Sequence, residues 1–208
     1  MDRYLGTQCR LCRREGEKLF LKGIRCETPK CAITKRKYPP GQFAWGRGKL
    51  SKYGVQFREK QKTKRFYGIL ERQFKNYYLK AERQKGHTGE NLLIMLERRL
   101  DNVVHLILFA SSRKNARQLI RHGHITVNNK RVNIPSYLVK ACDVIRPNTS
   151  EASQNIVKSN IELVKSRNTP AWVDLKLDVP EGVVTQVPTR EDISIPVQEQ
   201  LIVELYSK

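Results

Sequence analysis

Four of the five cysteines gather near the N-terminal end, with a spacing that suits a tetrahedral metal ion. Two residues separate Cys9 from Cys12 and four separate Cys26 from Cys31, with thirteen residues between the pairs. A C-x2-C pair binds one side of such an ion, and a pair returned by a loop binds the other. Four thiolates leave no open position, so we expect one structural zinc ion. An iron–sulfur cluster accepts the same four ligands, so it is an alternative to zinc that the sequence does not exclude.

Other states of these thiols are two disulfides, a reactive-thiol site or four unligated reduced thiols. The first residues, MDRYLGTQ, contain no apolar run of signal-peptide length, which favours a reducing cytoplasmic location, where disulfides are rare. The surrounding Lys and Arg are expected to lower the pKa of the thiols and to offset the charge of a four-thiolate zinc centre. Cys142, by contrast, is expected to be a small buried apolar residue.

A second set of residues combines a helix start with positive charge. A cap at Ser112 would begin a helix whose free N-terminal amides can bind phosphate. Arg113, Arg117 and Arg121 are spaced four residues apart, so they project from one helix face. A following hairpin brings further cations close. The predicted phosphate-binding groove comprises Ser112, Arg113, Lys114, Arg117, Arg121, His122, Lys130 and Arg131.

An aromatic and basic segment precedes this groove. Phe66, Phe74, Tyr77 and Tyr78 recur at helical spacing, and we expect them to form core, with stacking on unpaired RNA bases as the alternative. The cations between and before them are expected to face RNA phosphates. These predicted RNA contacts are Arg47, Lys49, Lys52, Arg58, Lys62, Lys64, Arg65, Arg72, Lys75, Arg83 and Lys85.

The overall charge favours a polyanionic partner. Lys and Arg number 40 against 20 acidic residues, for a net charge of +20, and 24 of the basic residues lie in positions 1–90. Such an excess is usually tolerated when the partner is nucleic acid. An acidic membrane surface is less suited, because arginine favours bidentate phosphate recognition and no apolar run is long enough to span a bilayer. Phosphate-binding glycine loops, nucleophile elbows and HExxH motifs are also missing from the sequence, which argues against an enzyme.

Hydrophobic periodicity predicts an α+β protein. Pro39-Pro40-Gly41 excludes helix between the cysteine arm and the basic segment. A hairpin is expected to turn at Asn128-Asn129, and the C-terminal segment 201–208 to dock on an earlier element. Helices are predicted over 55–85 with a possible break at Gly68, from Thr88 along one apolar stripe from Leu92 to Val104, over 111–123 and over 151–166, and short strands over 172–179, 183–187 and 193–197.

These elements predict two lobes and an arm. Residues 1–45 form the cysteine-rich metal-binding arm, and residues 46–95 form a helical RNA-binding lobe joined by 196–208. Residues 96–195 form a second RNA-binding lobe, in which helices pack on a small antiparallel sheet.

The segment SRKNARQLIRHGHITVNNKRVNIPSYLV, residues 112–139, closely resembles the S-four RNA-binding module. The resemblance continues in YPPGQ at 38–42, KLSKYGVQFREKQKTKRFYGILERQF at 49–74, TGENLLIMLERRLDNVV at 88–104 and the closing QLIVELYSK. Over essentially its full length the chain therefore resembles the S-four family of bacterial small-subunit ribosomal proteins. Its four clustered cysteines match the zinc-bearing branch of that family.

The resemblance implies a primary binder of small-subunit rRNA at a junction of several helices, acting early in assembly of the subunit body. It also implies contact with the neighbouring protein S-five, an influence on translational accuracy and a place near the channel through which mRNA enters. The alternative is an RNA-modifying enzyme of the pseudouridine synthase type with the same module. That alternative needs a catalytic domain, for which residues 148–208 are too few.

Overall fold

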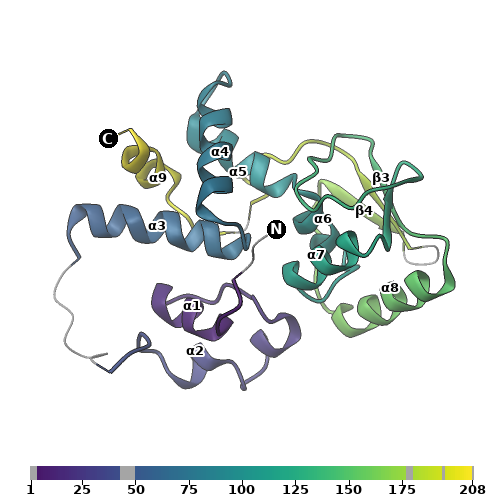
Figure 1. Ribbon diagram of the computed structural model, residues 1–208, viewed down its shortest axis with the longest axis horizontal. Helices are drawn as coiled ribbons and strands as arrows, with labels where there is room; N and C mark the ends of the chain where they lie inside the picture. The colour runs from purple at the N-terminus through teal and green to yellow at the C-terminus, as the bar shows by residue number, and fades with distance from the viewer. Residues whose placement is uncertain (1–3, 43–49, 177–179, 194, 208) are drawn as a thin grey trace. The chain divides into compact units, whose positions relative to one another are not determined.

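The chain forms two compact units in the computed structural model, which describes residues 4–42, 50–176, 180–193 and 195–207. The first unit combines the chain up to Leu92 with the C-terminal segment from Ile195. The second unit runs from Leu93 to Ser194. Figure 1 shows helices in both units and a sheet in the second.

The first unit is helical, and local sequence sets the ends of its helices. Gly16 (φ 77°) ends the first helix, and Ser51 caps the third by accepting a hydrogen bond from Gly54 N at 3.1 Å. Gly68 (φ 64°) separates the third helix from the fourth, which confirms the break proposed there. The elements are α1 (Gln8–Glu15), the 3-10 turn η1 (Gly23–Cys26), α2 (Ala32–Lys35), α3 (Lys52–Phe66), α4 (Glu71–Glu82), α5 (Thr88–Glu97, which continues into the second unit) and α9 (Glu199–Tyr206).

The C-terminal helix α9 packs on α3, which confirms the predicted docking (Figure 1). Gln56 Nε2 donates to Glu204 Oε2 at 2.6 Å, and the Tyr206 ring stacks on Tyr78 with ring centroids 4.5 Å apart. Phe74 and Tyr77 are also buried, so the aromatic stripe forms core as expected. The α4 cations Arg72 and Lys75 lie on the exposed side of the same helix.

The second unit packs helices on a five-stranded antiparallel sheet of order β2-β1-β3-β5-β4. Its core lies between the sheet and the helices α6, α7 and α8, with Trp172 among its largest fully buried side chains. The helices are α6 (Leu100–Leu106), α7 (Arg113–Arg121) and α8 (Glu151–Val164), and the strands are β1 (Ile125–Val127), β2 (Lys130–Arg131), β3 (Val144–Pro147), β4 (Val173–Lys176) and β5 (Glu181–Val184).

The predicted hairpin is present as β1 and β2. Asn128 and Asn129 have positive φ values of 49° and 63°, as a two-residue type I′ turn requires, and asparagine tolerates this region better than most residues. Thr126 therefore pairs with Arg131 and Val127 with Lys130. This register fixes the place of both hairpin cations.

Four details differ from the sequence-based predictions. The apolar stripe from Leu92 to Val104 is divided between α5 and α6, because Arg99 leaves helical geometry and caps α6. Strand β5 ends at Val184, and the described residues of 193–197 form no strand; prolines close by limit pairing there. The strand β3 (Val144–Pro147) lies outside the strand ranges that the sequence predicts. Cys142 itself is exposed, because it sits at a turn with a φ of 67°.

His105 is the group in α6 whose pKa is most strongly shifted. Its Nδ1 donates to the Ala110 carbonyl oxygen at 3.2 Å. Burial, together with the positive charges of Arg113 and Arg167, lowers the pKa of His105 to about 3. The folded state therefore holds this imidazole neutral near neutral pH.

Acidification should consequently destabilise the second unit. The folded pKa of His105 lies below the unfolded value of about 6.5, so stability is complete above that value and falls as the pH decreases toward 3. The free energy of unfolding should drop by up to about 2 kcal/mol between pH 7 and pH 5 from this residue. Unfolding of the wild-type chain and of His105→Asn at several pH values measures this drop in the free energy of unfolding. The asparagine amide can still donate to the Ala110 carbonyl oxygen but does not titrate, so the variant should lack the pH dependence. Parallel pH profiles for the two proteins would contradict the assignment.

Candidate nucleic-acid interface

Helix α7 begins as its sequence predicts. Ser112 has extended geometry, and its Oγ accepts a hydrogen bond from Asn115 N at 3.3 Å. Ala116, Leu119 and Ile120 are buried in the core of the second unit, which leaves the basic positions of α7 on the opposite side of the helix. The cap and the periodicity together direct the cations outward.

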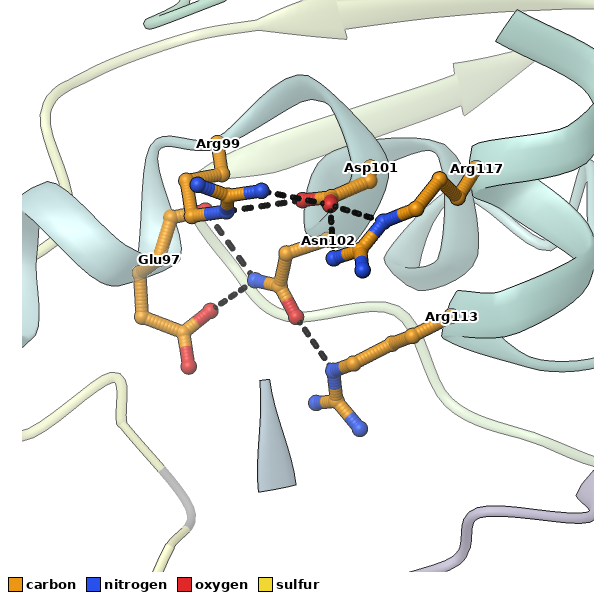
Figure 2. Close-up of polar contacts among 6 residues, drawn as sticks. All are labelled: Glu97, Arg99, Asp101, Asn102, Arg113 and Arg117. Carbon is orange, nitrogen blue, oxygen red and sulfur yellow. Dashed lines mark hydrogen bonds and ion pairs between the residues drawn. The ribbon is translucent and has the colours of Figure 1, made fainter. Parts of the chain in front are cut away.

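Two of these arginines are held by the first turn of α6 (Figure 2). Arg117 donates to Asp101 Oδ2 from Nε at 3.1 Å and from Nη2 at 2.6 Å. Arg113 donates from Nε to Asn102 Oδ1 at 2.7 Å. Asp101 and Asn102 follow the buried Leu100 directly, so the acceptors lie at the edge of the core.

The acceptors are themselves tied into a buried network. Arg99 donates to Asp101 from Nε (3.0 Å, to Oδ1) and from Nη2 (2.7 Å, to Oδ2). Asn102 Nδ2 donates to the Glu97 carbonyl oxygen at 3.0 Å and to the Glu97 carboxylate. The residues Glu97, Arg99, Asp101 and Asn102 received no role from the sequence. The sequence signal that could have identified them is the pair Asp101-Asn102 in the first turn of α6, next to the basic helix α7.

The other end of α7 is joined to the hairpin. Arg131 Nη2 donates to the His122 carbonyl oxygen at 3.2 Å, and its guanidinium lies directly against Gly123. Gly123 has a φ of 76°, so it suits both the helix end and this close approach. The predicted groove is thereby brought together along one helix and one hairpin, with Arg121, His122, Lys114 and Lys130 exposed.

The first unit divides its predicted RNA contacts into two groups. Lys52, Arg72, Lys75, Arg83 and Lys85 are exposed. The others that the structure describes are engaged with acidic side chains, and Arg47 and Lys49 lie outside the described residues. Arg58 and Arg65 pair with Glu15, Lys62 with Glu59 (2.8 Å) and Glu17 (3.5 Å), and Lys64 with Glu71 (2.9 Å).

The pairs made by Glu15 and Glu17 attach the cysteine arm to α3, whereas Glu59 lies on α3 itself and Glu71 on α4. The Glu15 side chain is only 1% exposed. Burial raises the pKa of Glu15 even though Arg65 and Arg58 act to lower it. Lys62 is buried as well, so it tethers the arm rather than reaching outward. Of the RNA contacts predicted in the first unit, those that the described structure leaves exposed are therefore the group on α3, α4 and the turn after α4.

The four clustered thiols have the chemistry of a zinc site. Cys12, Cys26 and Cys31 are buried, Cys9 is half-buried, and Cys26 Sγ accepts a hydrogen bond from Lys22 N at 3.3 Å. Burial, and secondarily the other three thiols, raises the pKa of Cys12, so the expected lowering by nearby cations is wrong for this residue. Burial raises the pKa of Cys26 in the same way.

The number, type and shared neighbourhood of these donors fit a four-thiolate ion. Within the described ranges, however, no three Cys, His, Asp or Glu side chains are arranged so as to hold a metal ion. The four cysteines therefore lie in the same arm, but their described positions are not those of a metal coordination shell.

Comparison with known proteins gives the family of the chain. Residues 3–97 match the family described as the ribosomal protein S4/S9 N-terminal domain, and residues 98–145 match the S4 domain. The small ribosomal subunit protein uS4 of Thermodesulfovibrio yellowstonii is 56% identical, and that of Citrifermentans bemidjiense is 58% identical, over 100% of both chains in each case. The chain belongs to the uS4 family.

The division between the two uS4-family matches falls next to the polar network. The S4-domain match begins at Arg98, directly after Glu97, and includes α6, α7 and the hairpin. The groove therefore lies within the S4 domain of this uS4-family chain, whereas the cysteines and the exposed cations of α3 and α4 lie within the other match. The uS4 relatives match from end to end, so the comparisons do not favour the alternative of a pseudouridine synthase. None of the helices in the described part of the chain could cross a membrane.

Proposed function

We propose that this chain is a structural, non-catalytic component of the small ribosomal subunit that binds the phosphate backbone of its rRNA. The observation that carries the proposal is the set of arginines on α7, with Arg113 and Arg117 held by α6 and Arg131 closing the far end on the hairpin. Full-length similarity to uS4 proteins supports the same conclusion. The protein accordingly acts in the cytoplasmic ribosome.

The mechanism is positional. Cations of α7 and the hairpin neutralise phosphates where RNA strands approach one another, and the exposed cations of the first unit form a second basic surface. Recognition rests mainly on backbone shape, because the deep major groove of A-form RNA hides its base edges. Binding thereby stabilises a fold of the rRNA that the naked RNA populates poorly.

Removing the held arginines should weaken binding without unfolding the protein. Arg113→Ala and Arg117→Ala should each reduce affinity for small-subunit rRNA about tenfold, because each removes a charge-assisted contact. Filter-binding titration measures the affinity, and thermal unfolding verifies the fold; Arg99 still neutralises Asp101 in Arg117→Ala. Lys158→Ala, on the exposed face of α8, is the control and should bind normally. Unchanged affinity in both arginine variants would exclude this groove.

We further propose that Cys9, Cys12, Cys26 and Cys31 hold one structural zinc ion, as in the zinc-bearing branch of the family. The support is the C-x2-C and C-x4-C spacing, the burial of three thiols and the hydrogen bond from Lys22 N to Cys26. When bound, the ion supplies a cross-link within the arm.

The remaining proposals rest on the resemblance to the family alone. They are a junction of rRNA helices as the binding site, early assembly of the subunit body and an effect on translational accuracy. Neighbouring small-subunit proteins, S-five first among them, and mRNA near the channel through which it enters are the proposed partners. Cross-linking followed by sequencing of the RNA adducts identifies the RNA partners directly.

A further inference from the structure

We propose that Asp101 and Asn102 are positioning residues, which preset the guanidinium groups of Arg117 and Arg113 for folded RNA. The proposal rests on the proposed RNA binding by α7 and adds to it the device that aims the two arginines. Figure 2 shows the arrangement: both acceptors project from the start of α6 toward α7, and each receives one arginine of α7, while Asp101 also receives Arg99.

Burial separates the positioning groups from the groups that meet RNA. Asp101 and Asn102 are each 1% exposed, so they cannot touch a ligand themselves. Arg113 and Arg117 are half-buried, and the Arg117 side chain keeps 19% of its surface exposed. Any effect of Asp101 or Asn102 on RNA affinity must therefore pass through the arginines.

The amide of Asn102 has one allowed orientation. Its Nδ2 faces two acceptors on Glu97, the carbonyl oxygen at 3.0 Å and a carboxylate oxygen. Since carbonyl and carboxylate oxygens accept hydrogen bonds, the donor end of the amide must point there and Oδ1 must point to Arg113 Nε. In Figure 2 the two terminal nitrogens of Arg113 lie on the side away from Asn102. Glu97 thus fixes the amide, and the amide fixes the arginine.

The negative charge of Asp101 is already balanced by Arg99, so Arg117 is not needed to neutralise it. A carboxylate paired with one arginine would leave that pair neutral and of little use to a phosphate. Here Arg99, which is 1% exposed, donates two hydrogen bonds to Asp101, while Arg117 donates two more to Oδ2. Two guanidinium groups share one carboxylate, so the network orients Arg117 and still carries a net positive charge.

The backbone that bears the acceptors is fixed as well. Leu100 N donates to the Tyr137 carbonyl oxygen at 2.8 Å, and Asp101 N donates to the Pro135 carbonyl oxygen at 3.1 Å. These bonds satisfy amides at the start of α6 that a helix leaves unpaired. A long, flexible arginine normally loses rotamer freedom when it binds, and side chains ordered in advance lose less. The rigid corner before α6 therefore favours RNA binding by ordering the arginines in the free protein.

A double-mutant cycle tests the action of Asn102 through Arg113. Asn102→Ala should weaken rRNA binding about two- to tenfold, because the arginine must then be ordered on binding. The same substitution should have no further effect in an Arg113→Ala background, whereas a general loss of structure would add to it. Lys114→Ala is the matched control: Lys114 is exposed in the same turn of α7, and its effect should add to that of Asn102→Ala. Additive effects in the Arg113 cycle would overturn the proposal.

Asp101 needs a different variant, because its removal strands the buried Arg99 and is expected to unfold the second unit. Arg117→Lys keeps the charge but cannot donate from both Nε and Nη2, so it should lose nearly as much affinity as Arg117→Ala. Arg121→Lys, one turn further along α7 at an exposed position, is the control and should lose much less. Equal losses at 117 and 121 would contradict the role of Asp101.

If neither Arg113→Ala nor Arg117→Ala changes affinity, the proposed groove itself fails; if both weaken binding but the cycle is additive, only the positioning role fails.

Discussion

Raising the monovalent salt concentration from about 50 to 200 mM should weaken binding of this chain to small-subunit rRNA by about 10³- to 10⁵-fold. Such a loss is expected when roughly six to ten phosphates are neutralised, because counterions released on binding must be returned to the RNA. The described residues provide enough exposed cations for that number. They include Lys52, Arg72, Lys75, Arg83 and Lys85 in the first unit and Lys114, Arg121, Lys130 and Arg131 in the second.

Affinities measured by filter binding at several salt concentrations give the slope of log K against log salt. A triple variant, Lys114→Gln with Arg121→Gln and Lys130→Gln, should reduce that slope by about three, since each phosphate contact contributes about one. Gln substitutions of Lys158 on α8 and of Lys165 directly after it serve as the control and should leave the slope unchanged. A wild-type slope near zero would mean that phosphate neutralisation does not drive the interaction.

The placement of the basic residues on α7 and the hairpin was predictable because its causes are local. A serine before a basic run caps a helix, residues four apart share a face, and an Asn-Asn pair turns a hairpin. Each rule acts over a few residues, and the structure has Ser112 as the cap and Asn128-Asn129 at positive φ. The apposition of helix and hairpin follows from the short connection through Gly123.

The partners of the cations on α3 were not predictable in the same way. Arg58 and Arg65 pair with Glu15, which lies 43 and 50 residues earlier in the chain. Helical periodicity shows that these arginines share a helix, but it cannot show that a glutamate of the basic arm lies against one side of that helix. Three cations that the sequence predicts as RNA contacts are therefore engaged with the arm in the fold, Arg58 and Arg65 with Glu15 and Lys62 with Glu17.

The positioning network was missed for a related reason. Asp101 and Asn102 look like ordinary first-turn residues of an apolar helix, where an acidic side chain is favourable in any case. Their role depends on the break of the helix at Arg99, which places their side chains toward α7. That break is set by hydrogen bonds from the segment 135–139, including Arg98 O accepting from Val139 N at 2.9 Å, and nothing local marks it.

Removing the proposed zinc should disorder the cysteine arm and leave the second unit intact. The arm is rich in loops, and Leu19 and Ile33 are among the few buried apolar side chains it holds besides its cysteines. So small a core rarely supports a folded segment without a metal or cross-links. Arg13 bonds to the carbonyl oxygens of Tyr38 and Pro39 at 3.0 and 3.2 Å, but these surface contacts contribute little by themselves. Because ion binding and folding are coupled in such segments, loss of the ion should remove most of the order of the arm.

Native mass spectrometry should find one zinc ion per chain, and both chelation and Cys12→Ser should abolish it. Hydrogen exchange should then accelerate over residues 8–35 and stay slow over 100–127, because the core of the second unit contains none of the four ligands. Cys142→Ser is the matched control, since that thiol is exposed and belongs to the other unit, and it should leave both metal content and exchange unchanged. Native protein that is free of metal yet fully protected in the arm would show that the ion pairs of Glu15 with Arg58 and Arg65 and of Glu17 with Lys62, rather than a metal, hold this segment on α3.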